Sequence, residues 1–197
     1  MSRFVLASSS PRRVRLLTEA GFHPEVLPSH ITEIQWDFLT PSEGALFNAV
    51  RKGMTIAVQH PDAVVLGADT IVTLGRQVFG KPADMEEAFQ ILKQLVGQTH
   101  EVVTGIAVIH LNKNRTRVAT ERTEVKFRSL TDSEIREYLE IAEPLDKAGA
   151  YAAQESPDRI IESVTGSFTN VVGLPMEIAR PLLAEFGIVP REVQKSE

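Results

Sequence analysis

The chain has 197 residues and a formal net charge of −5, from 21 lysines and arginines against 26 aspartates and glutamates. This acidic balance excludes a general basic field for nucleic acid, so any phosphate must be held by a few placed cations. The chain has no cysteine, which excludes disulfides, thiolate nucleophiles and cysteine-ligated zinc and fits a reducing compartment. Because no signal-peptide core or bilayer-spanning apolar run is found, we expect a cytoplasmic protein with neither nucleic acid nor membrane as partner.

The N-terminal residues predict a short buried strand at 4–7 that leads directly into a helix. Ser8-Ser9-Ser10 forms the turn, and Pro11 suits the first position of the helix. Such a helix start directs free backbone N–H groups toward one point, where Arg12 and Arg13 add full positive charges. The segment is either a phosphate cradle built without a Walker-type glycine loop or an ordinary serine-capped helix with two solvated arginines.

The next residues predict an extended segment at 23–27 and a polar loop at 29–39 that carries Glu33. A capping box, Thr40-Pro41-Ser42-Glu43, then begins a helix that runs to about Gln59. From local pattern alone, Glu33 is an ordinary loop carboxylate.

The apolar spacing of this helix predicts which of its faces is inward. Lys52 is roughly opposite that face and is therefore expected in solvent. The residues expected on the inner face are Leu46, Val50, Met54 and Ala57.

An acidic residue interrupts the next apolar stretch. Residues 63–66 predict a strand that Gly67-Ala68-Asp69-Thr70 breaks and residues 71–74 resume. A carboxylate so close to the core is expected to be paired, bound to a metal or placed at a strand end. The alternative is a turn aspartate that bonds to its own backbone.

The second half of the chain predicts further helices and strands. Their order, with helices alternating with strands before a hairpin, favours an α/β fold with a mixed twisted sheet and flanking helices. We expect a single domain over 1–197 with two lobes around a cleft, ending in a flexible tail at 192–197. The remaining elements are a helix at 84–96 with Met85 on its inner side, a hairpin at 101–127, a helix at 131–140, a strand near 160–161 and a helix at 175–186.

Three further segments have the composition of ligand-binding loops. In Gly80-Lys81-Pro82 the ammonium either reaches a phosphate as a point charge or is merely solvated. In Asp146–Gln154 the small residues allow close backbone approach and Gln154 could read a base edge, unless the run is only a tight crossing. Residues 166–175 are either a second anion-facing helix start or a structured turn.

Taken together and in this order, these segments resemble the Maf family. The resemblance implies a cytoplasmic nucleotide pyrophosphatase whose two-lobed α/β fold is related to inosine-triphosphate pyrophosphatases. It also implies a homodimer and a requirement for a divalent cation, Mg²⁺ or Mn²⁺. The matching stretches are Ser8–Arg13, Gly67–Thr70, Gly80–Pro82, Thr104-Gly105, Asp146–Gln154 and Asn170–Pro175.

The resemblance also implies catalytic roles. Asp69 would be the catalytic carboxylate, as proton acceptor for the attacking water or as metal ligand, and Glu33 would help to hold the metal. Lys52 and Lys81 would neutralise the triphosphate. Glu33 and Lys52 thus become site residues on this ground alone.

Substrate binding is assigned to five residues in the same way. Ser8 and Arg13 would contact phosphate groups. Arg12, Thr70 and Gln154 match positions associated with substrate choice.

The Gly-Ala-Asp-Thr and Asp-Lys-Ala-Gly-Ala-Tyr runs resemble the branch of the family that acts on dTTP and UTP. The expected reaction releases the nucleoside monophosphate and pyrophosphate. One departure is the segment Glu155–Arg159, which stands where the family commonly has glycine and which bears on fine specificity.

Two alternative functions remain open. One is a pyrophosphatase of broader range that acts on modified nucleotides. The other is a nucleotide-binding regulator of cell division without turnover, against which Glu33 and Asp69 argue, because a phosphate sensor gains nothing from nearby negative charge.

Overall fold

A computed structural model describes residues 3–34, 38–154 and 157–191. The predicted tail at 192–197 lies outside the described residues, as do residues 35–37 of the polar loop and residues 155–156 of the departing segment. The helices and strands are β1 (Phe4–Leu6), α1 (Pro11–Glu19), β2 (Glu25–Val26), α2 (Pro41–Gln59), β3 (Val64–Leu74), β4 (Gln77–Phe79), α3 (Met85–Leu95), β5 (Thr99–His110), β6 (Arg115–Phe127), α4 (Asp132–Ala142), α5 (Pro157–Ile160), β7 (Ile161–Thr165), α6 (Phe168–Val172) and α7 (Met176–Glu185).

The strands form one mixed seven-stranded sheet. Its order is β2-β1-β3-β5-β6-β7, and β4 pairs with β3. β1 is parallel to both β2 and β3, whereas β4 is antiparallel to β3 and β7 is antiparallel to β6. The predicted mixed sheet with flanking helices is confirmed.

The chain divides into two compact units, and β3, β5 and β6 contribute residues to both. Unit 1 contains the described parts of Met1–Asp69, Thr104–Glu121 and Gly173–Glu197. Unit 2 contains the described parts of Thr70–Val103 and Arg122–Val172.

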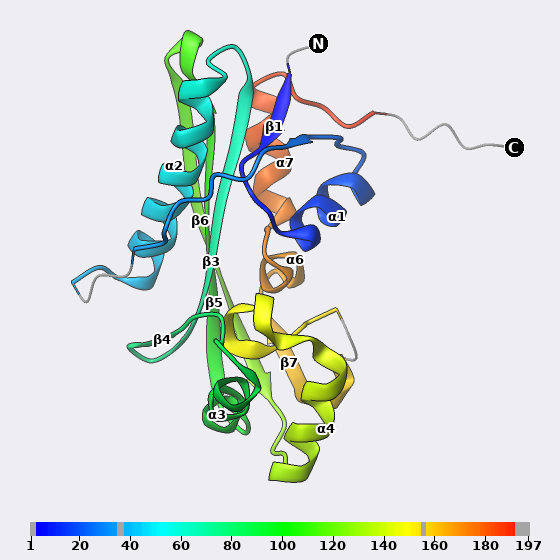
Figure 1. Cartoon of the computed structure of the whole chain (residues 1–197). Helices are drawn as coiled ribbons and strands as arrows, with labels where there is room; N and C mark the ends of the chain where they lie inside the picture. Colours follow the sequence, from blue (N-terminus) through cyan, green and yellow to red (C-terminus); the bar gives the residue numbers. More distant parts are fainter. Residues whose placement is uncertain (1–2, 35–37, 155–156, 192–197) are drawn as a thin grey trace, which may run out of the picture. The chain divides into compact units, whose positions relative to one another are not determined.

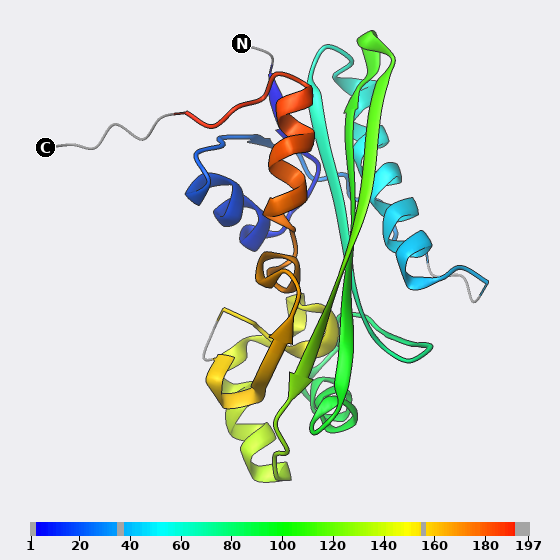
Figure 2. The ribbon, with the colours of Figure 1, turned by 180° about the vertical axis from the view of Figure 1, so that it is seen from behind.

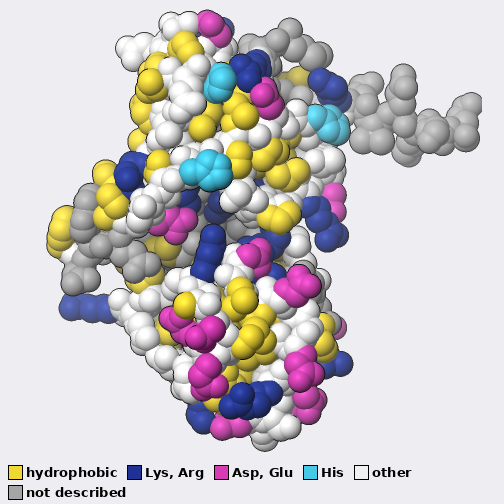
Figure 3. All heavy atoms as spheres, viewed as in Figure 1, with side chains coloured by type: hydrophobic (Ala, Val, Ile, Leu, Met, Phe, Trp, Pro, Cys, Tyr) yellow, Lys and Arg dark blue, Asp and Glu magenta, His cyan; other side chains and the backbone are white. Residues whose placement is uncertain are grey.

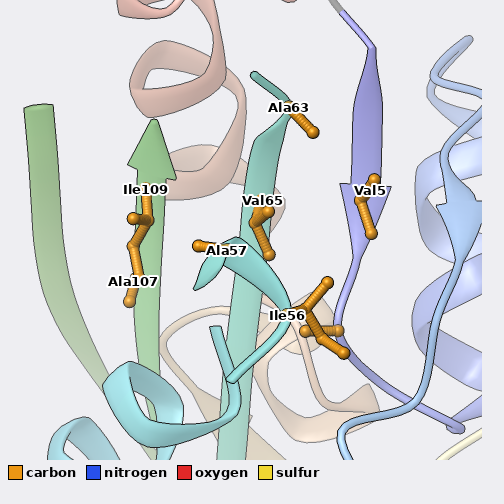
Figure 4. Packing of buried hydrophobic residues seen from close by; sticks show 8 residues of the cluster. Val5, Ile56, Ala57, Ala63, Val65, Ala107 and Ile109 are labelled. Carbon is orange, nitrogen blue, oxygen red and sulfur yellow. The ribbon is translucent and has the colours of Figure 1, made fainter. Parts of the chain in front are cut away.

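In unit 1, α2 covers one face of the sheet and α1 and α7 cover the other (Figures 1 and 2). The face under α2 is an apolar cluster in which Val5, Val65 and Ile109 from three strands pack with Ile56 and Ala57 from the helix (Figure 4). Alternate residues of a strand share a face, so Val65 places Gly67 and Asp69 on the side of α2 as well.

Helix α2 approaches the sheet very closely. A Cβ atom on Gly67 would lie 2.2 Å from the carbonyl oxygen of Ala49 and 2.7 Å from the amide nitrogen of Gly53. On β5, a Cβ atom on Gly105 would lie 2.5 Å from the carbonyl oxygen of Ala45. Glycine is therefore required at both strand positions because the helix backbone occupies the space of a side chain.

This close approach corrects two predictions. The strand does not break at residues 67–70, because β3 continues from Val64 to Leu74 and Gly67 makes room for the helix instead of a turn. The predicted inner face of α2 is confirmed only in part: Ala57 is buried and Val50 and Met54 pack partly buried against the apolar cluster, but small residues determine which side comes closest to the sheet. The buried residues of α2 are Ala45, Asn48, Ala49, Lys52, Gly53, Ile56 and Ala57, while Leu46, Val50 and Met54 are only partly buried.

The predicted caps are confirmed in both units. Thr40 and Glu43 form the capping box of α2, and Thr131 and Glu134 form that of α4. In unit 2, α3 packs on α4 and buries Phe89, but Met85 is 44% exposed, contrary to the prediction, because it is the first residue of the helix.

Unit 2 also buries a small polar and aromatic group. The rings of His100, Phe127 and Tyr151 pack edge to face, and His100 Nε2 lies 3.1 Å from the hydroxyl of Tyr151. Burial lowers the pKa of His100 to about 4, so this imidazole is neutral at physiological pH. Within the described residues, no helix is both long enough and apolar enough to span a membrane.

The close approach of α2 makes a stability prediction. We expect Gly67→Ala to lower the free energy of unfolding by about 1–3 kcal/mol, because the new methyl group collides with helix backbone that cannot move aside. Urea denaturation measures the difference. Gly44→Ala in the same helix is the control, since a Cβ atom there meets nothing within 4 Å and should leave stability unchanged or raise it by up to about 1 kcal/mol. Equal effects of the two substitutions would contradict this account of the packing.

Candidate active site

Asp69 is a buried carboxylate in the middle of a strand. It lies in β3 on the face toward α2, and the residue is 2% exposed. A charge in this environment must be paired. Its hydrogen-bond partners, Asn48 and Lys52, both come from α2.

Lys52 joins two carboxylates. Its Nζ atom lies 2.5 Å from Asp69 Oδ1 and 2.6 Å from Glu33 Oε1. The Lys52 side chain is 11% exposed, so the predicted solvated position is wrong. The reason is that Ala49 and Gly53 bring this side of α2 against β3, where Lys52 reaches Asp69.

The loop that carries Glu33 is bound to α2 on both sides of that residue. The Asn48 amide accepts a hydrogen bond from the Ile34 N–H group and donates one to the Ile34 carbonyl oxygen, each at 3.0 Å. Arg51 donates to the carbonyl oxygen of Thr32 at 2.9 Å. Asn48 Nδ2 also lies 3.3 Å from Asp69 Oδ2, so α2 supplies a donor to each oxygen of that carboxylate.

Arg13 is the buried cation of the segment between β1 and α1. Its Nε atom donates to the Gly173 carbonyl oxygen at 2.8 Å, and its Nη1 atom donates to Ser8 Oγ at 3.0 Å. Ser8 Oγ in turn accepts a hydrogen bond from the Ser10 N–H group, whereas the Ser10 side chain makes no cap hydrogen bond. The alternative of an ordinary serine cap with a solvated Arg13 is therefore wrong.

The charges of these groups shift the pKa values of Asp69 and Arg13. Burial raises the pKa of Asp69, Lys52 and Arg13 lower it, and Glu33 raises it. Burial likewise lowers the pKa of Arg13, against which Asp69 and Glu33 act to raise it. The cluster thus places two cations beside two carboxylates, with Arg12 half-buried next to Arg13.

Three predicted site residues lie in unit 2. Thr70 follows Asp69 in β3 and is partly buried, Gln154 is partly buried, and Lys81 is exposed in the loop after β4. The Gly149 N–H group donates to the Gly80 carbonyl oxygen at 3.1 Å, which joins the loop of Lys81 to the run that ends at Gln154.

Hydrogen bonds hold the run before Gln154 in place. Lys147 is 5% exposed and donates to the Glu143 carbonyl oxygen at 2.6 Å and to Asp146 at 2.8 Å. Further along, the Tyr138 hydroxyl accepts a hydrogen bond from the Ala152 N–H group at 3.1 Å. The segment is therefore a structured loop held by hydrogen bonds within its own unit.

The donor set suits a divalent cation with few protein ligands. No group of three or more histidines, aspartates or glutamates that could hold a metal is found within the described part of the chain. Glu33 and Asp69 nevertheless converge on one cationic nitrogen, which shows that their oxygens can share a positive charge. Mg²⁺ commonly uses one or two carboxylates and completes its shell with water and substrate phosphate oxygens.

Unit 1 brings together Ser8, Arg13, Glu33, Lys52 and Asp69, which are far apart in sequence. Sequence reasoning missed Asn48, although its position four residues before Lys52 places both on one side of a helix. It also missed the Gly173 carbonyl oxygen, because a backbone acceptor leaves no signal in the residue type.

The chain is similar to known proteins over most of its length. The sequence profile of the family described as Maf-like protein matches residues 3–186. A dTTP/UTP pyrophosphatase from Pelotomaculum thermopropionicum is 44% identical over 187 residues, which are 95% of this chain and 98% of that protein. A dTTP/UTP pyrophosphatase from Bacillus pumilus is 42% identical over 190 residues, which are 96% of this chain and 100% of that protein.

A solved structure of a HAM1 protein from Coxiella burnetii is similar to part of the chain. It is 18% identical, has a TM-score of 0.42 and matches 64% of this chain and 73% of that one. A similarity this weak supports no argument about function.

The burial of Lys52 beside Asp69 leads to a prediction about how stability depends on pH. In the folded protein the pKa of Asp69 is raised, so its contribution to stability falls as pH rises from the ordinary range of an aspartate through the raised value. Removing the Lys52 ammonium raises the pKa of Asp69 further, so the protein loses more stability as the pH rises. We expect Lys52→Met to destabilise the metal-free protein by about 3–5 kcal/mol at pH 8 and by less at pH 4.

Urea denaturation at the two pH values measures this effect. Lys93→Met is the control, because Lys93 pairs with Asp132 at the surface, where the two side chains are 49% and 62% exposed, and it should cost less than about 1 kcal/mol. A Lys52→Met effect that is the same at pH 4 and pH 8 would refute the role of Lys52 as counter-charge to Asp69.

Proposed function

This chain belongs to the Maf-like protein family, and on that premise we propose that it is a nucleoside triphosphate pyrophosphatase acting on dTTP and UTP. The products are the nucleoside monophosphate and pyrophosphate. The observation that carries the proposal is the buried Asp69 carboxylate, held by Lys52 together with Glu33. The names of the relatives from Pelotomaculum thermopropionicum and Bacillus pumilus support the choice of substrate.

Hydrolysis of a phosphoanhydride depends on positioning and charge neutralisation more than on covalent chemistry. Asp69 accepts the proton of the attacking water at a carboxylate oxygen. Its raised pKa makes it a better proton acceptor than a solvated aspartate, while Lys52 and Asn48 keep it oriented. The water attacks the α-phosphorus, and pyrophosphate leaves.

The phosphate groups are neutralised by cations from separate segments. Arg13, fixed by Ser8 and the Gly173 carbonyl oxygen, presents its charge in one orientation, which favours planar bidentate recognition of phosphate. The family resemblance assigns Lys81 a further charge for the phosphates and assigns Arg12, Thr70 and Gln154 the choice of nucleotide.

Glu33 and Asp69 would hold the divalent cation, Mg²⁺ or Mn²⁺. When bound, it would make the attacking water easier to deprotonate and would shield the phosphate oxygens from the two carboxylates. Without it, the negative charge of these carboxylates would repel the triphosphate.

We extend the proposal to a cytoplasmic homodimer that does not take nucleic acid as a partner. The net charge of −5 argues against nucleic acid, and acidic and basic side chains are interspersed on the face drawn in Figure 3. The dimer rests on the family resemblance.

A panel of nucleotides tests the reaction. We expect metal-dependent release of pyrophosphate and monophosphate from dTTP and UTP, weaker turnover of CTP, 7-methyl-GTP and ATP, and none with chelator. Chromatography identifies the products. Release of orthophosphate and diphosphate would mean attack at the γ-phosphorus, and turnover of modified nucleotides as fast as dTTP would favour the broad-range alternative.

Asp69→Asn separates an enzyme from a nucleotide-binding regulator. We expect kcat to fall by about 10²–10⁴-fold, which is the usual contribution of a general base, while binding of dTTP persists. A pyrophosphate assay measures kcat, and calorimetry measures the binding of dTTP. Asp132→Asn, a change at a carboxylate that is 62% exposed, should leave both unchanged. Full turnover by Asp69→Asn would remove Asp69 from the chemistry.

A further inference from the structure

Asn48 is a buried amide at the centre of the carboxylate cluster. It is 2% exposed and lies in α2, four residues before Lys52. Both of its N–H donors are used, one by the Ile34 carbonyl oxygen and one by Asp69 Oδ2. Its oxygen accepts from the Ile34 N–H group and, at 3.4 Å, from Arg51. The amide therefore has no unused donor.

These partners permit one orientation of the amide. Turned over, it would place its NH₂ group against the Ile34 N–H group and its oxygen against both the Ile34 carbonyl oxygen and the Asp69 carboxylate. Each of those contacts would be repulsive. Asn48 thus holds the residue next to Glu33 and one oxygen of Asp69 with a single rigid group.

A role in packing alone does not explain this residue. Asparagine is a poor helix former, and burying its amide is costly unless every bond is made. Alanine at this position would keep the close approach that Ala45 and Ala49 provide on the same face. An anchor for the loop alone would also have no need to donate to Asp69.

We propose that Asn48 is a positioning residue that fixes the two carboxylates, Glu33 and Asp69, relative to each other. This inference deepens the proposed function and rests on it for its effect on turnover. Glu33 comes from a loop and is 44% exposed, so its place depends on the bonds of its neighbours as well as on its own contact with Lys52. Asn48 binds the Ile34 side of that loop, and Arg51 binds the Thr32 side.

The expected consequence is a defect in metal use and turnover, not in nucleotide binding. The groups expected to meet the phosphates have other partners, because Arg13 donates to Ser8 and to the Gly173 carbonyl oxygen. The hydrogen bonds of Asn48 instead join Ile34, Asp69 and Arg51. Residues that orient metal ligands typically change metal affinity or activity by about 10–100-fold when removed.

Three variants test the proposal. Asn48→Ala removes all four contacts. Asn48→Asp keeps the shape and the acceptor for the Ile34 N–H group but can donate neither to Asp69 nor to the Ile34 carbonyl oxygen, and it places a negative charge beside Asp69. It preserves the test if the alanine variant folds poorly. Arg51→Met is the matched control, since it releases the loop at Thr32 and leaves the bond to Asp69 intact.

Three quantities are measured: amide hydrogen exchange at Ile34 by NMR, Mn²⁺ binding to the nucleotide-free protein by electron paramagnetic resonance, and kcat and KM for dTTP. For Asn48→Ala we expect faster Ile34 exchange, Mn²⁺ affinity and kcat lower by about 10–100-fold, and a nearly unchanged KM. For Asn48→Asp we expect Ile34 to stay protected while kcat still falls. Arg51→Met loosens only the Thr32 side of the loop, so it should lower Mn²⁺ affinity and kcat much less than Asn48→Ala does.

Wild-type Mn²⁺ affinity and kcat in both Asn48 variants would overturn the proposal. So would a fall in kcat with Arg51→Met as large as with Asn48→Ala, because the contact with Asp69 would then be irrelevant. If the wild type hydrolyses no nucleotide, the proposed function fails, while Ile34 exchange and Mn²⁺ binding still decide the role of Asn48.

Discussion

The close approach of α2 to β3 is the constraint on which the site depends. Gly67 lets the backbone of Ala49 and Gly53 occupy the space where a side chain would otherwise stand. At this distance the Lys52 ammonium reaches Asp69 in the middle of a strand. A helix held one methyl group further away would leave the Asp69 carboxylate buried without its counter-charge, which is among the most destabilising arrangements in a protein. The same glycine thus permits both the packing and the charge pair.

Unit 1 gathers more charge than a core of this kind usually contains. Arg13, Lys52 and Asp69 are all buried, and each has partners of opposite charge or backbone oxygens. Such a cluster is a weak source of stability, because desolvation offsets most of the attraction. In the proposed mechanism its value is preorganisation, because the groups assigned to phosphate and the group assigned to the proton are in place before the substrate arrives. The raised pKa of Asp69 is one result of this arrangement.

Unit 2 supplies the loops that carry Lys81 and Gln154. The bond from Gly149 to Gly80 joins two segments that are almost 70 residues apart in the chain. In the same unit, hydrogen bonds of Tyr138 and Lys147 hold the run that leads to Gln154. These loops are therefore shaped by interactions inside their own unit.

The sequence by itself determined where two helices begin and to which family the chain belongs. The capping boxes at Thr40 and Thr131 located two helices because their signals lie within four residues, and the motif order pointed to the family. Only the tertiary structure decided which side of α2 faces inward. The prediction followed the large apolar residues, but the distance between helix and sheet is set by the smallest residues on both, at Gly67, Ala49 and Gly53. The burial of Lys52 and the contacts of Asn48 follow from that distance. Neither the apolar periodicity of a helix nor a sequence motif predicts how closely the backbone of a neighbouring strand approaches it.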